Sequence, residues 1–205
     1  MIHISKDGTG DFKSIGEALR SLPADHTGEH LLYIHKGFYE EQITVRAPHV
    51  TFVGEDAEST ILSCGLYARM TMEDGMKRGT FRTYSCLIDT HDFTARNLTF
   101  ENSAGTGTDV GQALAFYADG DRLHFENCRF LGNQDTLFTG PLPPKEIEPN
   151  GFIGPKQHSP RINGRHYYKN CYLEGILTLF SAVPPLILKA VPFFPSTQEW
   201  RSAAM

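Results

Sequence analysis

Short runs of alternating apolar and polar residues dominate the chain after its first 25 residues. Residues 31–35 form an apolar run typical of a buried strand. Ile43, Val45, Val50 and Phe52 then alternate with polar positions, which is the period of a strand that buries one face. Gly, Asn, Asp and Pro separate these runs, and no convincing amphipathic helix follows. The pattern therefore predicts many short strands.

Near the N-terminus the hydrophobic period is helical instead. A turn over residues 8–12 precedes Ile15, Ala18, Leu19 and Leu22, which recur at spacings of three and four residues. Pro23 ends the run. We expect one short N-terminal helix in an otherwise all-β chain.

A six-residue unit recurs four times and reads polar, apolar, polar, apolar, any residue, then Gly or Asn. The units begin at His49, Asn97, Asn127 and Asn170, at spacings of 48, 30 and 43 residues. Irregular spacing suits a solenoid whose strands stack while loops of varied length leave its corners. Asn suits such a corner because it tolerates the left-handed conformation and its amide can bond the next coil. The pattern predicts a right-handed parallel β-helix and leaves an irregular β-sandwich as the alternative.

Two further expectations follow from the repeat. The second residue of each unit should point into one coil interior, which places Val50, Leu98, Cys128 and Cys171 together. Cys128 and Cys171 should be close, buried and reduced, acting as small apolar groups. Residues 141–160 are rich in proline and polar, so we expect a long loop beside the coil rather than a strand or helix.

Composition narrows the functional classes. The 205 residues are 40% hydrophobic and 21% charged, which suits one folded domain and argues against general disorder. A net charge of -5 argues against a nucleic-acid-binding protein, which needs clustered Lys and Arg. No 18-residue apolar run is present, so no membrane span or membrane partner is expected. Residues 1–7 lack the pattern of a secretory signal.

The sequence gives little support for a metal site. None of the four cysteines (Cys64, Cys86, Cys128 and Cys171) forms a Cys-x-x-Cys pair, which argues against a zinc ribbon. We expect buried thiols, with one incidental disulfide as the alternative. We expect no metal site among the nine histidines either.

Three polar residues are candidates for chemistry. Gln112 opens one predicted strand, and the pair Gln134 and Asp135 follows the next unit. If the units stack, these side chains lie on neighbouring turns of one face. Two amide donors beside a carboxylate can stabilise an oxyanion and transfer protons. Each residue alone is more often a solvated surface group, and this pattern does not name a reaction.

Several motifs in one order resemble the pectinesterases, or pectin methylesterases, a family of right-handed parallel β-helices. The resembling segments are Gly8-x-Gly10-Asp11-Phe12, Gly37-Phe38-Tyr39-Glu40-Glu41, Asn97-Leu98-Thr99-Phe100-Glu101-Asn102, Gln112-Ala113-Leu114-Ala115, Asn127-Cys128-Arg129-Phe130-Leu131-Gly132 with Gln134-Asp135-Thr136-Leu137, and Tyr168 to Gly175. They are collinear with the family from residue 7 to about residue 175.

The resemblance implies hydrolysis of methyl-esterified polygalacturonate (pectin) in cell wall modification or pectin catabolism. In this family an aspartate attacks the ester to form an acyl-enzyme, and an arginine in a Gly-Arg-Pro-Trp motif orients it. Asp135 matches the second aspartate, which protonates methanol and then activates water, while Gln112 and Gln134 match the two oxyanion donors. The resemblance implies no cofactor, a monomer, and a secreted, cell wall or periplasmic location.

Three aromatic residues near these motifs are candidates for substrate binding. Phe116, Tyr117 and Phe138 could stack on sugar rings in the cleft of such an enzyme. Packing inside the coil is the equally open alternative for each of them.

The chain departs from the family after Gly175. The family continues to a nucleophile strand reading Asp-Phe-Ile-Phe-Gly, whereas residues 176–180 read Ile-Leu-Thr-Leu-Phe, and no Gly-Arg-Pro-Trp motif follows. Codons that encode Leu177 to Ala190, read two bases in, can encode Asp-Phe-Ile-Phe-Gly. We therefore expect residues 1–175 to be an incomplete pectinesterase-like β-helix and residues 176–205 to be an out-of-frame tail.

Two functional hypotheses follow. The chain is a carboxylic ester hydrolase of the pectinesterase family, or it is an inactive remnant that at most binds pectin. Because the nucleophile is missing, we expect no turnover by this polypeptide. A polygalacturonase or lyase of the β-helix type is disfavoured because the clustered carboxylates of those enzymes are not seen.

Overall fold

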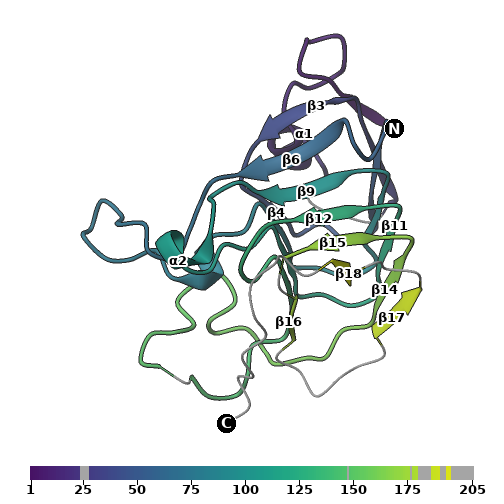
Figure 1. Ribbon diagram of the computed structural model, residues 1–205. Coiled ribbons are helices and arrows are strands. Elements are labelled where there is room, and N and C mark those ends of the chain that lie inside the picture. Colours follow the sequence, from purple (N-terminus) through teal and green to yellow (C-terminus); the bar gives the residue numbers. More distant parts are fainter. Residues whose placement is uncertain (24–27, 147, 176, 180–185, 190–192, 195–205) are drawn as a thin grey trace.

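Three parallel sheets build the molecule. The computed structural model describes residues 1–23, 28–146, 148–175, 177–179, 186–189 and 193–194. Within these residues, strands that are distant in sequence stack directly above one another (Figure 1). We name the sheets A, B and C, and the chain visits them in that order once per coil.

Each complete coil contributes one strand to each sheet, and every neighbouring pair is parallel. Sheet A contains β1 (Ile2–Ile4), β2 (His30–Ile34), β5 (Val50–Gly54), β8 (Thr94–Arg96), β11 (Leu123–Glu126), β14 (His166–Lys169) and β17 (Leu186–Lys189). Sheet B contains β3 (Gly37–Glu40), β6 (Thr60–Cys64), β9 (Thr99–Asn102), β12 (Arg129–Leu131), β15 (Tyr172–Glu174) and β18 (Phe193–Phe194). Sheet C contains β4 (Ile43–Val45), β7 (Cys86–Ile88), β10 (Phe116–Ala118), β13 (Leu137–Thr139) and β16 (Leu177–Leu179). This stacking is that of a parallel β-helix and not that of a sandwich.

The expected N-terminal helix is present as α1 (Ile15–Arg20), next to the first strands of sheets A and C (Figure 1). Ser14 caps it, because its hydroxyl accepts a hydrogen bond from the Glu17 amide at 3.0 Å. The carboxylate of Glu41, next to β4, accepts the amides of Ile15 and Gly16 at 2.9 and 2.8 Å. A negative charge at this end also complements the helix dipole. The first coil therefore holds the helix that covers it.

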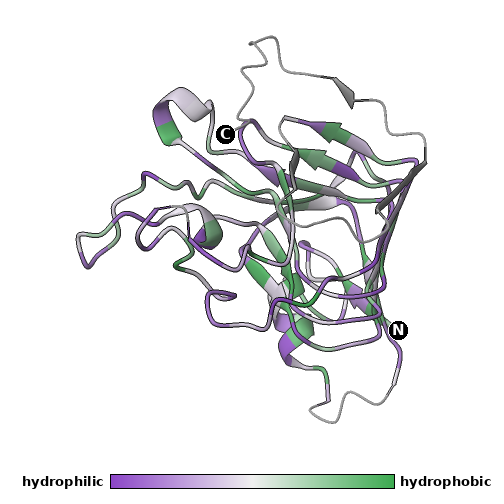
Figure 2. Cartoon of the chain, turned by 90° about the horizontal axis from the view of Figure 1, so that it is seen from below, coloured by the Kyte–Doolittle hydropathy of each residue, from purple (hydrophilic) through white to green (hydrophobic). Residues whose placement is uncertain are grey.

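The other helical segments are single turns, η1 (Thr80–Arg82) and α2 (Gly107–Val110). Across the part of the chain that the structure describes, no helix is both long and apolar enough to cross a lipid bilayer. Figure 2 shows that hydrophobic stretches lie in the stacked strands, whereas the loops that project from them are largely hydrophilic. The alternation seen in the sequence therefore separates a coil interior from a solvated exterior.

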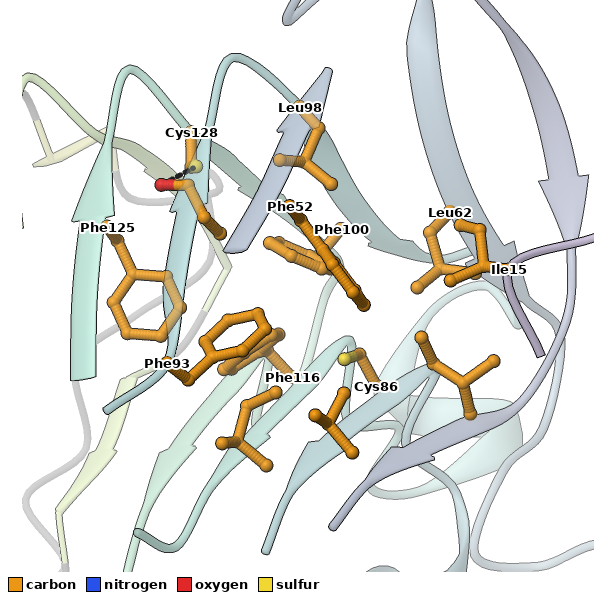
Figure 3. Close-up of a cluster of buried hydrophobic side chains, with 14 of the residues drawn as sticks. Ile15, Phe52, Leu62, Cys86, Phe93, Leu98, Phe100, Phe116, Phe125 and Cys128 are labelled. Atoms are coloured by element: carbon orange, nitrogen blue, oxygen red, sulfur yellow. Dashed lines mark hydrogen bonds between the residues drawn. The ribbon is translucent and has the colours of Figure 1, made fainter. Parts of the chain in front are cut away.

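Aromatic side chains fill the coil interior (Figure 3). Phe93 contacts Phe52 and Phe125 with ring centroids 5.1 and 6.0 Å apart. Phe125 stacks in turn on Tyr168, with centroids 4.7 Å apart. These four rings are almost completely buried, and burying each contributes roughly 2–3 kcal/mol of transfer free energy. The core is therefore a continuous column that runs from coil to coil.

The four inward positions expected from the repeat are confirmed. Val50, Leu98 and Cys128 have no exposed surface, and Cys171 is 2% exposed, in the same interior cluster. Cys128 and Cys171 are close enough for their thiols to hydrogen bond, and all four cysteines are free. Burial raises the pKa of the Cys128 thiol well above its ordinary value. These thiols pack as small apolar groups.

The asparagine corner between sheets A and B is also confirmed. Asn97, Asn127 and Asn170 have φ values of 56°, 53° and 51°. The amide of Asn127 donates to the Asn97 side chain at 3.1 Å, and the amide of Asn170 donates to Asn127 at 3.4 Å. We call this row the asparagine ladder. It fixes the same left-handed turn in three successive coils.

The first unit of the proposed repeat was aligned wrongly. The pairing of β5 with β8 sets Thr51 opposite Thr94, so Gly54, and not His49, is level with Asn97. His49 lies at the preceding corner, level with Asp92 and Arg122, where these three residues also have positive φ. Every strand that buries one face shows the same alternation of apolar and polar residues. A strand of sheet A was therefore aligned with strands of sheet B, because the alternation alone does not distinguish them.

The proline-rich loop departs from the coil between β13 and β14. As expected, the described residues of 141–165 contain no helix or strand. The loop is nevertheless anchored, because Leu142 and Phe152 are buried against the outer face of sheet C. They join an outer cluster with Phe81, Tyr84, Leu87, Leu114, Tyr117 and Phe138.

The chain beyond Gly175 is described only in part. The backbones of β16, β17 and β18 pair with β13, β14 and β15, so each of the three sheets gains one more strand. The remainder of the tail, residues 176, 180–185, 190–192 and 195–205, lies outside the described residues.

Candidate functional site

Gln112, Gln134 and Asp135 lie where the chain enters two neighbouring strands of sheet C. Gln112 precedes β10, and the Gln134–Asp135 pair precedes β13. The amide of Ala113 donates to the carbonyl of Gln134 at 3.0 Å, which joins the two segments directly. All three side chains are half-buried. Residues 22 apart in sequence are thus neighbours because the coils stack.

Local backbone geometry shapes this end of sheet C. Asp135 has a φ of 59°, a left-handed conformation that Asp tolerates better than most residues. The side chain of Gln134 packs against α2, since a Cβ on Gly107 would lie 2.2 Å from its Oε1. Gly107 thus leaves room for the amide of Gln134.

A buried amide supports the segment that carries Gln112. Asn102, at the end of β9, is only 3% exposed, and its Nδ2 lies 2.9 Å from the carbonyl of Leu66 and 3.0 Å from those of Thr83 and Leu114. Its Oδ1 accepts the amide of Ala104 at 3.0 Å. The Thr83 hydroxyl accepts the amide of Leu114, also at 3.0 Å. Both backbone polar groups of Leu114, two residues after Gln112, are therefore held by side chains.

Sequence reasoning gave Asn102 no role beyond the last position of a repeat unit. The sequence signal that could have revealed this role is an asparagine at the end of a strand whose other residues are mostly buried. Such a residue must satisfy its amide inside the protein, and so it joins segments that would otherwise be separate.

The three aromatic candidates for sugar stacking are buried, so of the two alternatives the structure favours packing within the protein. Phe116 has no exposed surface and packs in the coil interior against Phe100, with ring centroids 4.5 Å apart. Tyr117 and Phe138 are 0% and 1% exposed and contact each other in the outer cluster. The physical reason is that Tyr117 and Phe138 do face away from the coil, but Phe81 and the 141–165 loop cover them.

Charged residues gather at the opposite end of the same strands. Lys156, from the 141–165 loop, contacts the carboxylate of Asp89 and lies 3.8 Å from that of Asp119. Asp119 follows β10, and its side chain is 9% exposed. Burial raises the pKa of Asp119 to about 6, and the positive charge of Lys156 only partly offsets this effect. These ion pairs attach the loop to sheet C.

The arrangement near Gln112 offers two amide side chains and one carboxylate at the edge of a rigid sheet. Amide donors of this kind can stabilise negative charge on a substrate oxygen, and a carboxylate can exchange a proton. Far from it in the fold, His49, His91 and Asp92 place potential metal-binding atoms within 4.8 Å of one another.

Comparison with known proteins decides the family. The family model described as Pectinesterase matches residues 1–141. The chain belongs to the pectinesterase family. Among curated relatives, it is 34% identical over 181 residues to Pectinesterase 31 of Arabidopsis thaliana, covering 85% of this chain and 50% of that protein. It is 33% identical over 181 residues to Pectinesterase 1 of Olea europaea, covering 85% of this chain and 42% of that protein.

Solved pectin methylesterases share the fold. The one named PemA from Erwinia chrysanthemi superimposes with a TM-score of 0.66 at 26% identity, covering 85% of this chain and 49% of that one. The enzyme from carrot gives a TM-score of 0.61 at 27% identity, covering 85% and 46%. A pectin methylesterase solved in complex with a hexasaccharide gives 0.66 at 26% identity, covering 85% and 49%. The chain thus spans about half the length of these enzymes, and half or less of the two curated relatives above.

Proposed function

We propose that residues 1–175 carry the oxyanion and acid–base half of a pectin methyl ester hydrolase site. The observation that carries the proposal is the hydrogen bond from Ala113 to Gln134, because it sets Gln112 beside the Gln134–Asp135 pair at one end of sheet C. Family membership supplies the substrate class, a methyl ester of polygalacturonate. The solved complex with a hexasaccharide supports an oligosaccharide ligand for this fold.

In this proposal the amides of Gln112 and Gln134 donate hydrogen bonds to the carbonyl oxygen of the ester. These bonds strengthen as that oxygen gains negative charge in the tetrahedral intermediate. Asp135, when protonated, gives its proton to the departing methoxide, and its carboxylate then accepts a proton from the attacking water. None of these steps forms the acyl-enzyme, which requires a separate nucleophile.

We further propose that this polypeptide binds pectin without cleaving it, because position 177 and its neighbours supply no aspartate. Residues 176–205 are proposed to be an out-of-frame tail, as the alternative reading of their codons indicates. Sequencing the gene across codons 170–180 tests the tail directly. An unaltered reading frame there would contradict it.

The binding half of the proposal is tested by titrating a methyl-esterified oligogalacturonate into the chain while methanol release is measured. We expect saturable binding and no methanol above background. Gln112→Ala and Gln134→Ala should each weaken binding of the ester. Gln157→Ala, the same change in the 141–165 loop, is the matched control and should not.

Two outcomes separate the hypotheses. An absence of binding, or equal binding by all three variants, would contradict the proposed half-site. Robust methanol release by the 205-residue chain would show that another carboxylate acts as nucleophile, and Asp109 and Glu174 would be the first to replace. Turnover gained only after the Asp-Phe-Ile-Phe-Gly strand is restored would support both parts of the proposal.

A further inference from the structure

Two histidines and an aspartate meet at the sheet A corner that precedes β5 and β8. His49 and His91 are 42 residues apart, but their rings contact edge to face, with centroids 5.5 Å apart. The Nδ1 atoms of His91 and His49 lie 2.7 and 3.8 Å from Oδ2 of Asp92. All three residues reach solvent, with side-chain exposures of 42% for His49, 50% for His91 and 27% for Asp92.

These distances are close to those of a zinc site. With Zn–N and Zn–O bonds of about 2.0–2.1 Å, neighbouring ligand atoms of a tetrahedral zinc ion are about 3.3 Å apart. These two separations fall on either side of that value, and all three ligand atoms lie within 4.8 Å of one another, so rotations of the exposed side chains would complete the geometry. Two imidazoles and one carboxylate are ligands that zinc accepts readily.

Stacking of the coils explains why the site has no sequence motif. The pairing of β5 with β8 sets His49 level with Asp92, and both have the left-handed φ that turns the chain at this corner. The ligands therefore come from successive coils. A metal ion held here would connect the β5 coil to the β8 coil.

A competing cation is built into the same corner. The guanidinium of Arg122 bonds both carboxylate oxygens of Asp92, and its Nη2 lies 3.3 Å from Nδ1 of His91. Arg122 also donates through Nη1 to Asp121 at 2.8 Å. It is 46% exposed, so it can leave Asp92 and keep Asp121 as its partner.

We propose that His49, His91 and Asp92 form a zinc-binding site, with solvent as the fourth ligand, and that zinc displaces Arg122 toward Asp121. This proposal is independent of the esterase proposal, since the two regions share no residue. It also predicts which change will strengthen binding. Removing the positive charge of Arg122 eliminates both the competitor for Asp92 and the repulsion of the ion.

The experiment is calorimetric titration of ZnCl₂ into the full chain and its variants in a buffer that does not bind zinc. We expect one equivalent to bind, His49→Gln and His91→Gln each to weaken binding by at least about tenfold, and Arg122→Gln to tighten it several-fold. Calcium, which prefers oxygen ligands, should not compete. The four cysteines should not contribute, because all are buried.

His35→Gln is the matched control. His35 is also a surface histidine beside another histidine and a carboxylate. Its Nε2 faces His3 and its Nδ1 faces Glu55, so the potential metal-binding atoms of the three residues do not point to one place. Zinc binding should be unchanged in this variant. The proposal is overturned if the unaltered chain binds no zinc, if His35→Gln weakens binding as much as His91→Gln, or if Arg122→Gln weakens it.

Discussion

Asn102 is the residue whose replacement should most clearly test how the candidate site is supported. Its side chain joins the 65–85 segment, β9 and the segment that carries Gln112 through three carbonyls and one amide. The amide group has two hydrogens, so three carbonyls share two donors at any moment. Asn102→Ala therefore removes about three hydrogen-bond equivalents from a site that is 3% exposed.

The expected loss of stability comes from leaving these buried carbonyl and amide groups without hydrogen-bond partners. A lost hydrogen bond typically changes stability by about 1 kcal/mol, and an unpaired buried group adds up to about 3 kcal/mol. We expect Asn102→Ala to lower the free energy of unfolding by about 3–5 kcal/mol. Asn102→Asp should be at least as destabilising, because its carboxylate would face carbonyl oxygens where a donor is needed.

The assay is urea unfolding followed by circular dichroism, together with amide hydrogen exchange. The amide of Leu114 should lose protection first, since Asn102 holds the carbonyl of the same residue. Asn133→Ala, a half-buried asparagine near the site, is the control and should change stability by less than about 0.5 kcal/mol. A loss below about 1 kcal/mol for Asn102→Ala, or milder effects for Asn102→Asp, would refute the reasoning.

Three further outcomes test other parts of the structure. Because burial raises the pKa of Asp119 to about 6, the folded chain keeps a proton that the unfolded chain releases, so the free energy of unfolding should fall by about 1–3 kcal/mol between pH 4 and pH 6. Asp119→Asn should flatten this fall in urea titrations, and an unchanged profile would contradict the assignment. Asn127→Ala should destabilise the chain by about 1–2 kcal/mol more than Asn127→Gly. Both variants lose the hydrogen bonds of the asparagine ladder, but only alanine is strained at a φ of 53°. Equal melting temperatures of the two variants would exclude backbone strain. Gly54→Ala should destabilise by about 3 kcal/mol or more, since its Cβ would lie 2.1 Å from the Asn97 carbonyl, whereas Gly28→Ala meets open space and should be nearly neutral.

The sequence predicted the features that depend on local pattern. Alternation gave the strands, and the recurrence of Asn97, Asn127 and Asn170 gave one corner, because a left-handed turn restricts residue choice. The corner at His49 was placed wrongly. His49, Asp92 and Arg122 share a left-handed backbone conformation there, but they are three different residue types, so no residue recurs in the sequence to mark this corner.

The candidate site was likewise predictable only in those parts that depend on local sequence. Gln112, Gln134 and Asp135 were singled out by their positions beside predicted strands, the resemblance supplied their roles, and stacking brings their segments together. The burial of Phe138 was not predictable, because it depends on where the 141–165 loop folds back onto sheet C. Contacts such as that between His49 and His91 depend on loop lengths and register over 42 residues, which no short motif records.

The asparagine ladder has a consequence for how such a chain can grow. Its steps from Asn97 to Asn127 and from Asn127 to Asn170 are 30 and 43 residues long in sequence, yet each is closed by one side-chain hydrogen bond. The additional residues of the longer step are accommodated by the excursion between β13 and β14, outside the stacked strands. The number of residues in a coil therefore does not determine how far that coil advances along the axis of the β-helix. Segments can be gained or lost at such an excursion while every coil above and below keeps its register, so the surroundings of a binding cleft can diversify without any revision of the interior.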